Sequence, residues 1–432
     1  MQARRGPEFS LQSWGANSYG QLGHGGVEDR PVPGLCDAAA LKDKAVRVVT
    51  GGGGHTAVIT EDGEVFVCGQ NHRGQLGLGH LTDISTLQRC LGLTQTVTNV
   101  TCGWDFTLFL TDSGRVLSCG SNAFGQLGIG QKPAYTADVQ IVESLKAAVV
   151  SVAAGLRHSL AVTDSGCVYQ WGIGLMSQAK RTLSPSPVPS HLSSVLPSLV
   201  PGLNQKMSRV VAAGSMHCVC LTENGDLFLW GSNKHSQLLS SEPFLSSPTP
   251  VERSLLGGET VLRVWSGWTH IVAQTETGRV FTWGRGNYGQ LGRHASTSQS
   301  SESQSTTEDQ EVRLPEEVPA LQGATQVFSL FLAKAHADSC SNSSRQPSTV
   351  FQYELMKLHF CSTFQLQSDE RETRKQLTYL QTQSSLTLFV LCSFELSAAP
   401  NKAAFILTYG FLFPFRAGIV CRASRSPCVR SK

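Results

Sequence analysis

The chain has 432 residues, enough to bury a large core, and 42 of them are glycine. Charged residues make up 16% of the sequence, and the formal net charge is +3. Lys and Arg number 12 against 6 Asp and Glu in residues 328–432, which leaves 23 against 26 in residues 1–327. This slightly acidic body excludes a nucleic-acid-binding groove, which needs a basic face.

The chain begins with a short arm, residues 1–8, whose basic side chains are Arg4 and Arg5. The arm is not followed by an apolar run of the kind found in a secretory signal peptide, so we expect a reducing compartment and a cytoplasmic protein. The thirteen cysteines agree with this expectation, because they form no C-x-x-C pair and no Cys/His spacing typical of zinc.

One phrase recurs along residues 9 to about 327: Trp-Gly or Cys-Gly, followed in most copies by N-x-x-G-Q-L-G. Its copies begin 51 to 59 residues apart, and a nearly fixed period of that size is typical of an array of equivalent structural units. The six copies begin at Trp14, Cys68, Cys119, Trp171, Trp230 and Trp283.

Within a unit, a G-x-x-H turn precedes an apolar run, an acidic-x-Gly turn and a second apolar run that ends in the phrase. The first complete unit shows this order at residues 52–55, 61–63 and 64–68. Short runs rich in Val, Leu, Phe and Thr between such turns predict strands joined in hairpins. We therefore predict an all-β protein built as a β-propeller, with about 50 residues and four strands in each blade.

Several repeated residues have a predicted structural role. The glycines of N-x-x-G-Q-L-G and of acidic-x-Gly permit the positive φ of a strand reversal. The Leu of Q-L-G is expected to fill the space between neighbouring sheets, and its Gln to hydrogen-bond backbone at the blade edge. The His of G-x-x-H occurs at most once per blade, so these histidines cannot converge on one metal ion and are interpreted as structural. Small core residues are predicted at Cys68, Cys119, Cys218 and Cys220.

Two insertions interrupt the repeat at residues 177–206 and 293–312, the first rich in Ser and Pro and the second rich in Ser and other polar residues. Both are interpreted as flexible loops on the same rim, with a regulatory or partner-binding role as the alternative. The unit at Trp171 also departs from the phrase in the residues that follow, so we expect its blade to be looser.

The repeat stops early. Residues 321–327 begin another blade, and no repeat element follows, which leaves five complete units, a half-unit at Trp14 and a trailing strand at residues 324–327. We expect a truncated or alternatively spliced chain whose propeller does not close, with open sheet edges.

Residues 328–432 are interpreted as a disordered or non-native tail. Its apolar run at residues 403–421 approaches the length of a membrane helix, which is the alternative reading. Because Pro414 and Arg416 interrupt that run, we expect no membrane span.

The combination of W-G-x-N-x-x-G-Q-L-G, G-x-x-H-T and D-x-G resembles the regulator-of-chromosome-condensation repeat family over about three quarters of the chain. The resemblance implies a seven-bladed propeller as the full family fold. Residues 51–55, 102–107, 154–158 and 265–277 are most similar to family members that act in protein secretion, and this implies a protein of the cytoplasm and also of the nucleus.

The resemblance also implies a site. In this family the exchange face uses outward x positions of the G-x-x-H loops, where acidic members are important. Asp105 is the one acidic residue at these positions in the five loops, so it is the candidate exchange-face residue, with a turn or capping role as the alternative. Trp104, Arg157 and Trp268 hold other x positions and are candidate partner-binding residues, because Trp and Arg are typical interface anchors.

Two functions follow from these observations. The first is a guanine nucleotide exchange factor for a small GTPase in the regulation of secretion, and the second is a non-catalytic scaffold that binds an exocyst component. A ubiquitin-ligase adaptor is a distant third. The sequence has no P-loop, G-x-S-x-G or H-E-x-x-H pattern, so we find no hydrolase, transferase or oxidoreductase signature and expect no cofactor and no metal.

Overall fold

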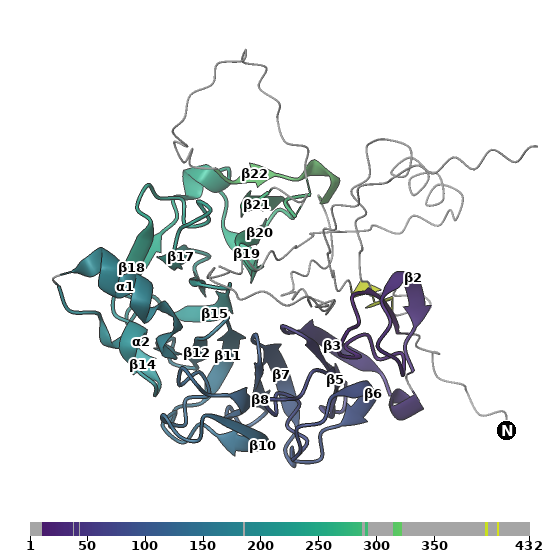
Figure 1. Cartoon of the computed structure of the whole chain (residues 1–432). Coiled ribbons are helices and arrows are strands. Elements are labelled where there is room, and N and C mark those ends of the chain that lie inside the picture. Colours follow the sequence, from purple (N-terminus) through teal and green to yellow (C-terminus); the bar gives the residue numbers. More distant parts are fainter. Residues whose placement is uncertain are drawn as a thin grey trace, which may run out of the picture.

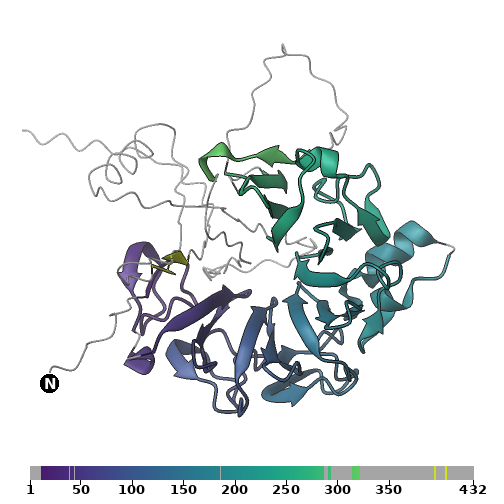
Figure 2. The same cartoon turned by 180° about the vertical axis from the view of Figure 1, so that it is seen from behind.

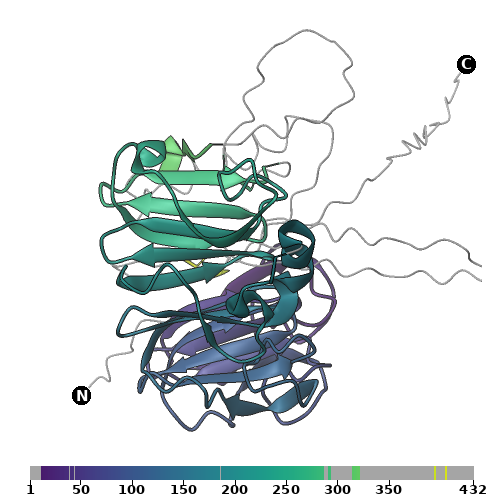
Figure 3. The same cartoon turned by 90° about the vertical axis from the view of Figure 1, so that its left-hand side faces the viewer.

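The computed structural model describes residues 11–37, 39–42, 44–184, 186–286, 290–292 and 314–321, together with the short strands β23 (Phe394–Glu395) and β24 (Ala404–Phe405). Five antiparallel sheets of four strands and one of two strands account for the strands up to residue 321. They follow one another around an arc in chain order (Figure 1), which Figures 2 and 3 show from behind and from the side. The predicted all-β propeller is confirmed, with five complete blades and a leading half-unit.

Each blade is a meander in which consecutive strands are neighbours. The half-unit pairs β1 (Gln12–Gly15) with β2 (Arg30–Leu35), and the 3-10 turn η1 (Ala39–Leu41) follows it. Blade 1 contains β3 (Val46–Gly51), β4 (His55–Thr60), β5 (Val65–Gly69) and β6 (Ile84–Arg89). Blade 2 contains β7 (Val97–Cys102), β8 (Phe106–Thr111), β9 (Val116–Ser121) and β10 (Tyr135–Ile141).

The remaining blades repeat this order. Blade 3 contains β11 (Val149–Ala154), β12 (Ser159–Thr163), β13 (Val168–Trp171) and β14 (Ser198–Leu199). Blade 4 contains β15 (Ser208–Ala213), β16 (His217–Thr222), β17 (Leu227–Ser232) and β18 (Phe244–Pro250), followed by η3 (Arg253–Leu256). Blade 5 contains β19 (Val261–Ser266), β20 (His270–Thr275), β21 (Val280–Gly284) and β22 (Glu316–Glu317), followed by η4 (Pro319–Leu321).

The core lies between successive blades. The second strand of every blade, β4 for example, is buried along its whole length. The first strands lie nearest the middle of the arc (Figure 1), and in β7 the side chains of Thr98 and Asn99 are exposed there. Burial of the apolar side chains between blades is therefore the main stabilising contribution, at roughly 25 cal/mol per Å² of apolar surface.

Where the Q-L-G segment is present, it ties its blade to the next one. Leu76 of blade 1 is fully buried in a cluster that includes Phe109 and Cys119 of blade 2, as the sequence predicts. The Gln side chain hydrogen-bonds backbone, as predicted, but within its own turn: the Oε1 atom of Gln75 accepts a hydrogen bond from the Arg73 amide at 2.9 Å. The Gln75 carbonyl makes the link between blades, since it accepts a 2.6 Å bond from the Thr107 hydroxyl.

The same link recurs around the ring with different donors. The Gln126 carbonyl accepts from the Ser159 hydroxyl at 2.7 Å and from the Trp171 indole at 2.9 Å. Cysteine in place of Trp keeps the position buried, and the Cys119 thiol lies 3.5 Å from the Gln75 carbonyl. The prediction that Cys68, Cys119, Cys218 and Cys220 are core residues is confirmed, and burial raises the pKa of each thiol.

The histidines of the G-x-x-H turns are structural, as predicted. His55, His158, His217 and His270 are all fully buried. Desolvation lowers the pKa of His158 to about 4 and that of the other three to about 3. His55 Nε2 lies 2.9 Å from the Thr107 hydroxyl of the next blade, and His217 Nε2 lies 2.8 Å from the Ser266 hydroxyl.

The repeated glycines serve two physical purposes. Gly74, in the N-x-x-G turn of blade 1, has φ +80°, as the sequence predicts for a reversal. The glycine of G-x-x-H is needed for space instead: a Cβ on Gly214 would lie 1.9 Å from Cε1 of His217. In blade 4 the turn lacks its glycines, so Ser236 and Leu239 adopt φ 57° and 55°, a region that costs a residue with a side chain about 1 kcal/mol.

The first insertion folds and packs, so the prediction of a flexible loop is wrong, whereas the looser blade stays a prediction. After η2 (Ile173–Leu175) come α1 (Met176–Leu183), α2 (Ser190–Ser193) and β14. Ala179 and Leu192 are fully buried in a cluster that includes Trp230 of blade 4. Sequence analysis missed these helices because polar Ser and Pro residues outnumber the few apolar side chains that are buried.

The insertion at residues 293–312 and the trailing strand at residues 324–327 lie outside the described residues, as does nearly all of the segment 328–432. Within the described part of the chain, no helix is both long and apolar enough to cross a membrane.

Candidate functional site

Two sets of loops meet on one side of the blades. In blades 1, 2 and 4 the residue after the W/C-G phrase donates its amide to a G-x-x-H loop: Gln70 to the Gly54 carbonyl, Ser121 to Asp105 and Ser232 to Met216, each at 2.8 Å. The N-x-x-G turns follow directly on these residues. We call the surface formed by the G-x-x-H loops and the N-x-x-G turns the loop face.

Neighbouring loops on this face are hydrogen-bonded to each other. The Gly53 amide donates to the Trp104 carbonyl at 2.9 Å, the Leu156 amide to Ser215 at 3.2 Å, and the Ser215 amide to Trp268 at 2.9 Å. The Ser215 hydroxyl donates to the same Trp268 carbonyl at 2.7 Å. Loops held at both ends by strands and bonded sideways form a rigid surface.

Two of the predicted residues touch each other across the ring. The centroids of the Trp104 and Trp268 rings are 5.7 Å apart, with their planes inclined by 46°. Because the two residues come from blade 2 and blade 5, three places apart, the contact spans the middle of the loop face. Trp104 is half-buried, whereas Trp268 is only 8% exposed, so the expectation that every x position points outward is wrong for Trp268.

Asp105 is half-buried beside Trp104. Burial raises the pKa of its carboxyl, while a hydrogen bond with the Ser121 side chain and the charges of Arg157 and Arg73 act in the opposite direction. The carboxylate therefore interacts with Ser121, Arg157 and Arg73 of its own chain. The backbone carbonyl of Asp105 also accepts a hydrogen bond from the Ser121 amide.

Arg157 is exposed, as predicted, and lies against an aromatic ring. Its guanidinium carbon is 4.1 Å from the centre of the Phe124 ring, which is a close cation–π contact. The loop that carries it is fixed by a 3.2 Å hydrogen bond from the Gly174 amide to the Arg157 carbonyl. The structure thus brings Arg157 and Asp105 together and places Trp104 next to them.

Sequence analysis missed the contribution of the N-x-x-G turns. The positive charge of Arg73, from the turn of blade 1, acts to lower the pKa of the Asp105 carboxyl. The guanidinium carbon of Arg73 lies 6.0 Å from the centre of the Tyr135 ring. The rings of Tyr19 and His72 are 6.3 Å apart on neighbouring turns. The signal was present, because the two x positions of N-x-x-G vary from copy to copy while the Asn and the Q-L pair recur together in four of the six copies.

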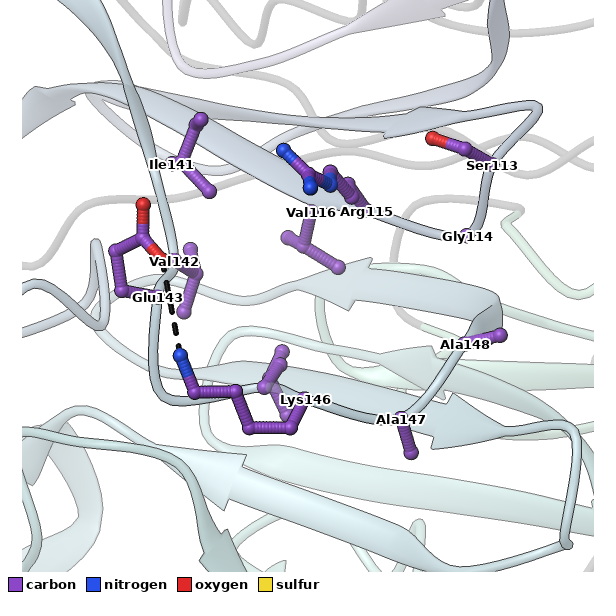
Figure 4. Close-up of a pocket in the computed structure, with 11 residues that line it drawn as sticks. Ser113, Gly114, Arg115, Val116, Ile141, Val142, Glu143, Lys146, Ala147 and Ala148 are labelled. Carbon is purple, nitrogen blue, oxygen red and sulfur yellow. Dashed lines mark ion pairs between the residues drawn. The ribbon is translucent and has the colours of Figure 1, made fainter.

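The opposite face carries the acidic-x-Gly turns and a hollow of about 250 Å³ next to β9 and β10 (Figure 4). Lys146 and Glu143 form an exposed ion pair of 3.8 Å at its edge, and such pairs contribute little. Throughout the described ranges, no group of three or more His, Cys, Asp or Glu is arranged to hold a metal ion.

A model of the RCC1-like domain family matches residues 10–341 of the chain. The chain is 47% identical over 332 residues to the secretion-regulating guanine nucleotide exchange factor of Bos taurus, covering 74% of this chain and 70% of that protein. It is 50% identical over 288 residues to the Mus musculus protein of the same name, covering 66% and 61%. The ultraviolet-B receptor UVR8 of Arabidopsis thaliana is 31% identical over 287 residues, covering 66% and 62%.

Solved structures agree on the fold. Yeast RCC1 (Prp20), in its complex with Kap60, superposes with a TM-score of 0.62 at 20% identity and covers 76% of this chain and 75% of its own. Human WBSCR16 superposes with a TM-score of 0.57 at 25% identity, covering 72% and 79%.

Proposed function

Because this chain belongs to the RCC1-like domain family, we propose that it is a guanine nucleotide exchange factor for a small GTPase and that it acts in the regulation of protein secretion. The observation that carries the proposal is its 47–50% identity to two proteins named for that activity. The matched stretches span 70% and 61% of those relatives.

The chemistry of exchange suits the loop face. An exchange factor binds the nucleotide-free GTPase more tightly than the nucleotide-bound form, so by linkage its binding weakens the nucleotide. This requires a surface that keeps its shape rather than a nucleophile or a metal. The hydrogen bonds between the Gly53, Trp104, Ser215 and Trp268 loops support such a surface.

We assign the contact with the GTPase to Trp104 and Arg157, with Asp105 as a positioning residue that holds the neighbouring arginines. Trp104 and Arg157 are accessible in part or in full and are of the residue types that dominate interface energies. Trp268 contacts the Trp104 ring and is itself largely buried, so it is less accessible to a partner.

The test is the release of labelled GDP from a panel of small GTPases in the presence of the full chain. We expect one GTPase to release its nucleotide faster. Trp104→Ala should reduce that stimulated rate by about tenfold or more, since hot-spot truncations cost about 2 kcal/mol. Arg115→Ala, an exposed change on the opposite face, is the matched control and should leave the rate unchanged. Absence of any response from the panel would contradict the exchange activity.

The alternative function is a non-catalytic scaffold that binds an exocyst component. The observation that favours it is the scarcity of acidic residues on the loop face, where Asp105 is already engaged by its own chain. A pull-down that needs Trp104 while no GTPase releases nucleotide would establish this alternative. We further propose a cytoplasmic protein with a nuclear fraction, which cell fractionation with an antibody to the chain would test.

A further inference from the structure

We propose that the loop face recognises an acidic segment of a protein partner through Arg73 and Arg157. This inference rests on the proposed function because it places the partner on the same loop face. The two arginines come from blades 1 and 3, on either side of Asp105 in blade 2, and both side chains are exposed.

Each guanidinium is held by an aromatic ring. Arg157 stacks on Phe124 at 4.1 Å and Arg73 lies 6.0 Å from the centre of the Tyr135 ring. Stacking leaves the edge of a guanidinium free to donate two parallel hydrogen bonds, the geometry that matches a carboxylate. An arginine already held in place also loses less conformational entropy when it binds.

The charges of the face are complementary to such a segment. The x positions of the described G-x-x-H and N-x-x-G turns hold three cations, Arg73, Arg157 and Lys234, against one acid, Asp105. Asp105 offsets part of the charge of Arg73 and Arg157, and the count of three cations against one acid still leaves an excess of positive charge on these turns. Charge complementarity of this kind sets specificity and the rate of association.

The surroundings favour a protein segment over a nucleic acid or a membrane. Residues 1–327 contain 23 basic and 26 acidic side chains, so an extended polyanion would meet repulsion beyond the arginines. Half-buried apolar side chains border the site, namely Trp104, Phe124, Tyr19 and Met216. They suit a peptide in which acidic and apolar residues alternate.

The test uses fluorescence anisotropy of a fluorescein-labelled peptide of alternating Glu and Leu, titrated with the full chain. We expect saturable binding that weakens as salt rises, and a loss of about tenfold or more in the Arg73→Gln, Arg157→Gln double variant, because the variant removes the charge-assisted hydrogen bonds to the carboxylates. Arg115→Gln is the matched control, and it should bind as the original chain does. Equal binding of a Gln-for-Glu peptide, no binding, or full binding by the double variant would overturn the proposal.

Further measurements separate a folding defect and other anions. An Arg73→Lys, Arg157→Lys variant keeps the charge, so partial recovery of binding at an unchanged melting temperature supports recognition by charge and guanidinium shape together. Tighter binding of phosphatidylserine vesicles or single-stranded DNA, lost in the Gln variant, would reassign the site to those polyanions. Peptide binding without GDP release in the panel would refute exchange and retain this inference, whereas GDP release without peptide binding would do the reverse.

Discussion

Acidification is expected to unfold this protein well above the pH at which carboxylates titrate, because the G-x-x-H histidines are buried in the neutral form. Their folded-state pKa values of about 3 to 4 lie below the ordinary value of 6.5. Between these pKa values the four histidines bind protons in the unfolded chain and stay neutral in the folded chain. Stability is complete above pH 6.5 and falls as pH decreases through 6.5 toward the folded-state values.

The magnitude follows from linkage. Each histidine lowers the free energy of unfolding by about 1.4 kcal/mol for each pH unit below 6.5. The four together therefore lower it by about 5 kcal/mol between pH 7.5 and 5.5. That is comparable with the whole stability of many domains, about 5–15 kcal/mol. Burial of these four side chains is complete, so solvent screening does not reduce the effect.

The assay is urea unfolding at pH 7.5, 6.5 and 5.5, followed by the fluorescence of the buried indoles of Trp171, Trp230 and Trp283. The matched variant is His158→Phe, since Phe106 occupies the equivalent position in blade 2 and packs on Gly103 as His158 packs on Gly155. Because burial lowers the pKa of His191 as well, to about 4, five histidines contribute, and we expect this variant to lose about a fifth less stability over the same range. An unfolding free energy that stays constant from pH 7.5 to 5.5, or a variant with an unaltered slope, would refute the reasoning.

Three further predictions concern the repeat itself and use urea midpoints at pH 7.5. Ser236→Gly should stabilise blade 4 by about 1 kcal/mol, because it removes a side chain from a positive-φ position, and a lower midpoint would contradict this. Leu239→Gly should give no such gain, since Leu239 packs against the core between blades 4 and 5. Gly214→Ala should destabilise the protein by several kcal/mol or prevent folding, because its Cβ would lie 1.9 Å from the His217 ring. Gly92→Ala is the control and should change the midpoint little, because the nearest neighbour of its Cβ would be at 3.6 Å. Leu127→Ala should cost about 3 kcal/mol by opening a cavity between blades 2 and 3, and a cost below 1 kcal/mol would show that the Leu is not the filler we describe.

The fold could be predicted from the sequence because its information is local and repeated. Turn glycines, alternating apolar runs and a fixed period specify four strands at a time, and the structure places five such blades in chain order. The contact between blades that the Gln75 carbonyl makes was missed, because backbone groups leave no mark in a sequence pattern, while the side chain bonds backbone only within its own turn.

The site was predictable in part. Trp104, Asp105 and Arg157 come together because their loops start from equivalent positions in consecutive blades. Burial of Trp268 depends on a contact with Trp104 across the ring, which no local pattern encodes. The aromatic rings that hold the arginines were missed for a related reason, since Phe124 belongs to a turn whose neighbour is fixed by packing between blades.

The link between the Q-L-G turn of one blade and the second strand of the next has a consequence for how such a chain can be recombined. A Q-L-G turn belongs to one sheet and the residues that it contacts belong to the next sheet. A single sheet is therefore not the module that can be exchanged. Removing residues 97–141, a whole sheet, would leave Leu76 and the Gln75 carbonyl without the Phe109 and Thr107 they contact. Removing residues 71–121, from one phrase to the next, would leave each remaining Q-L-G turn next to the second strand that it contacts now. The segment by which this protein can gain or lose a blade is therefore offset by about one strand from the four-stranded sheet.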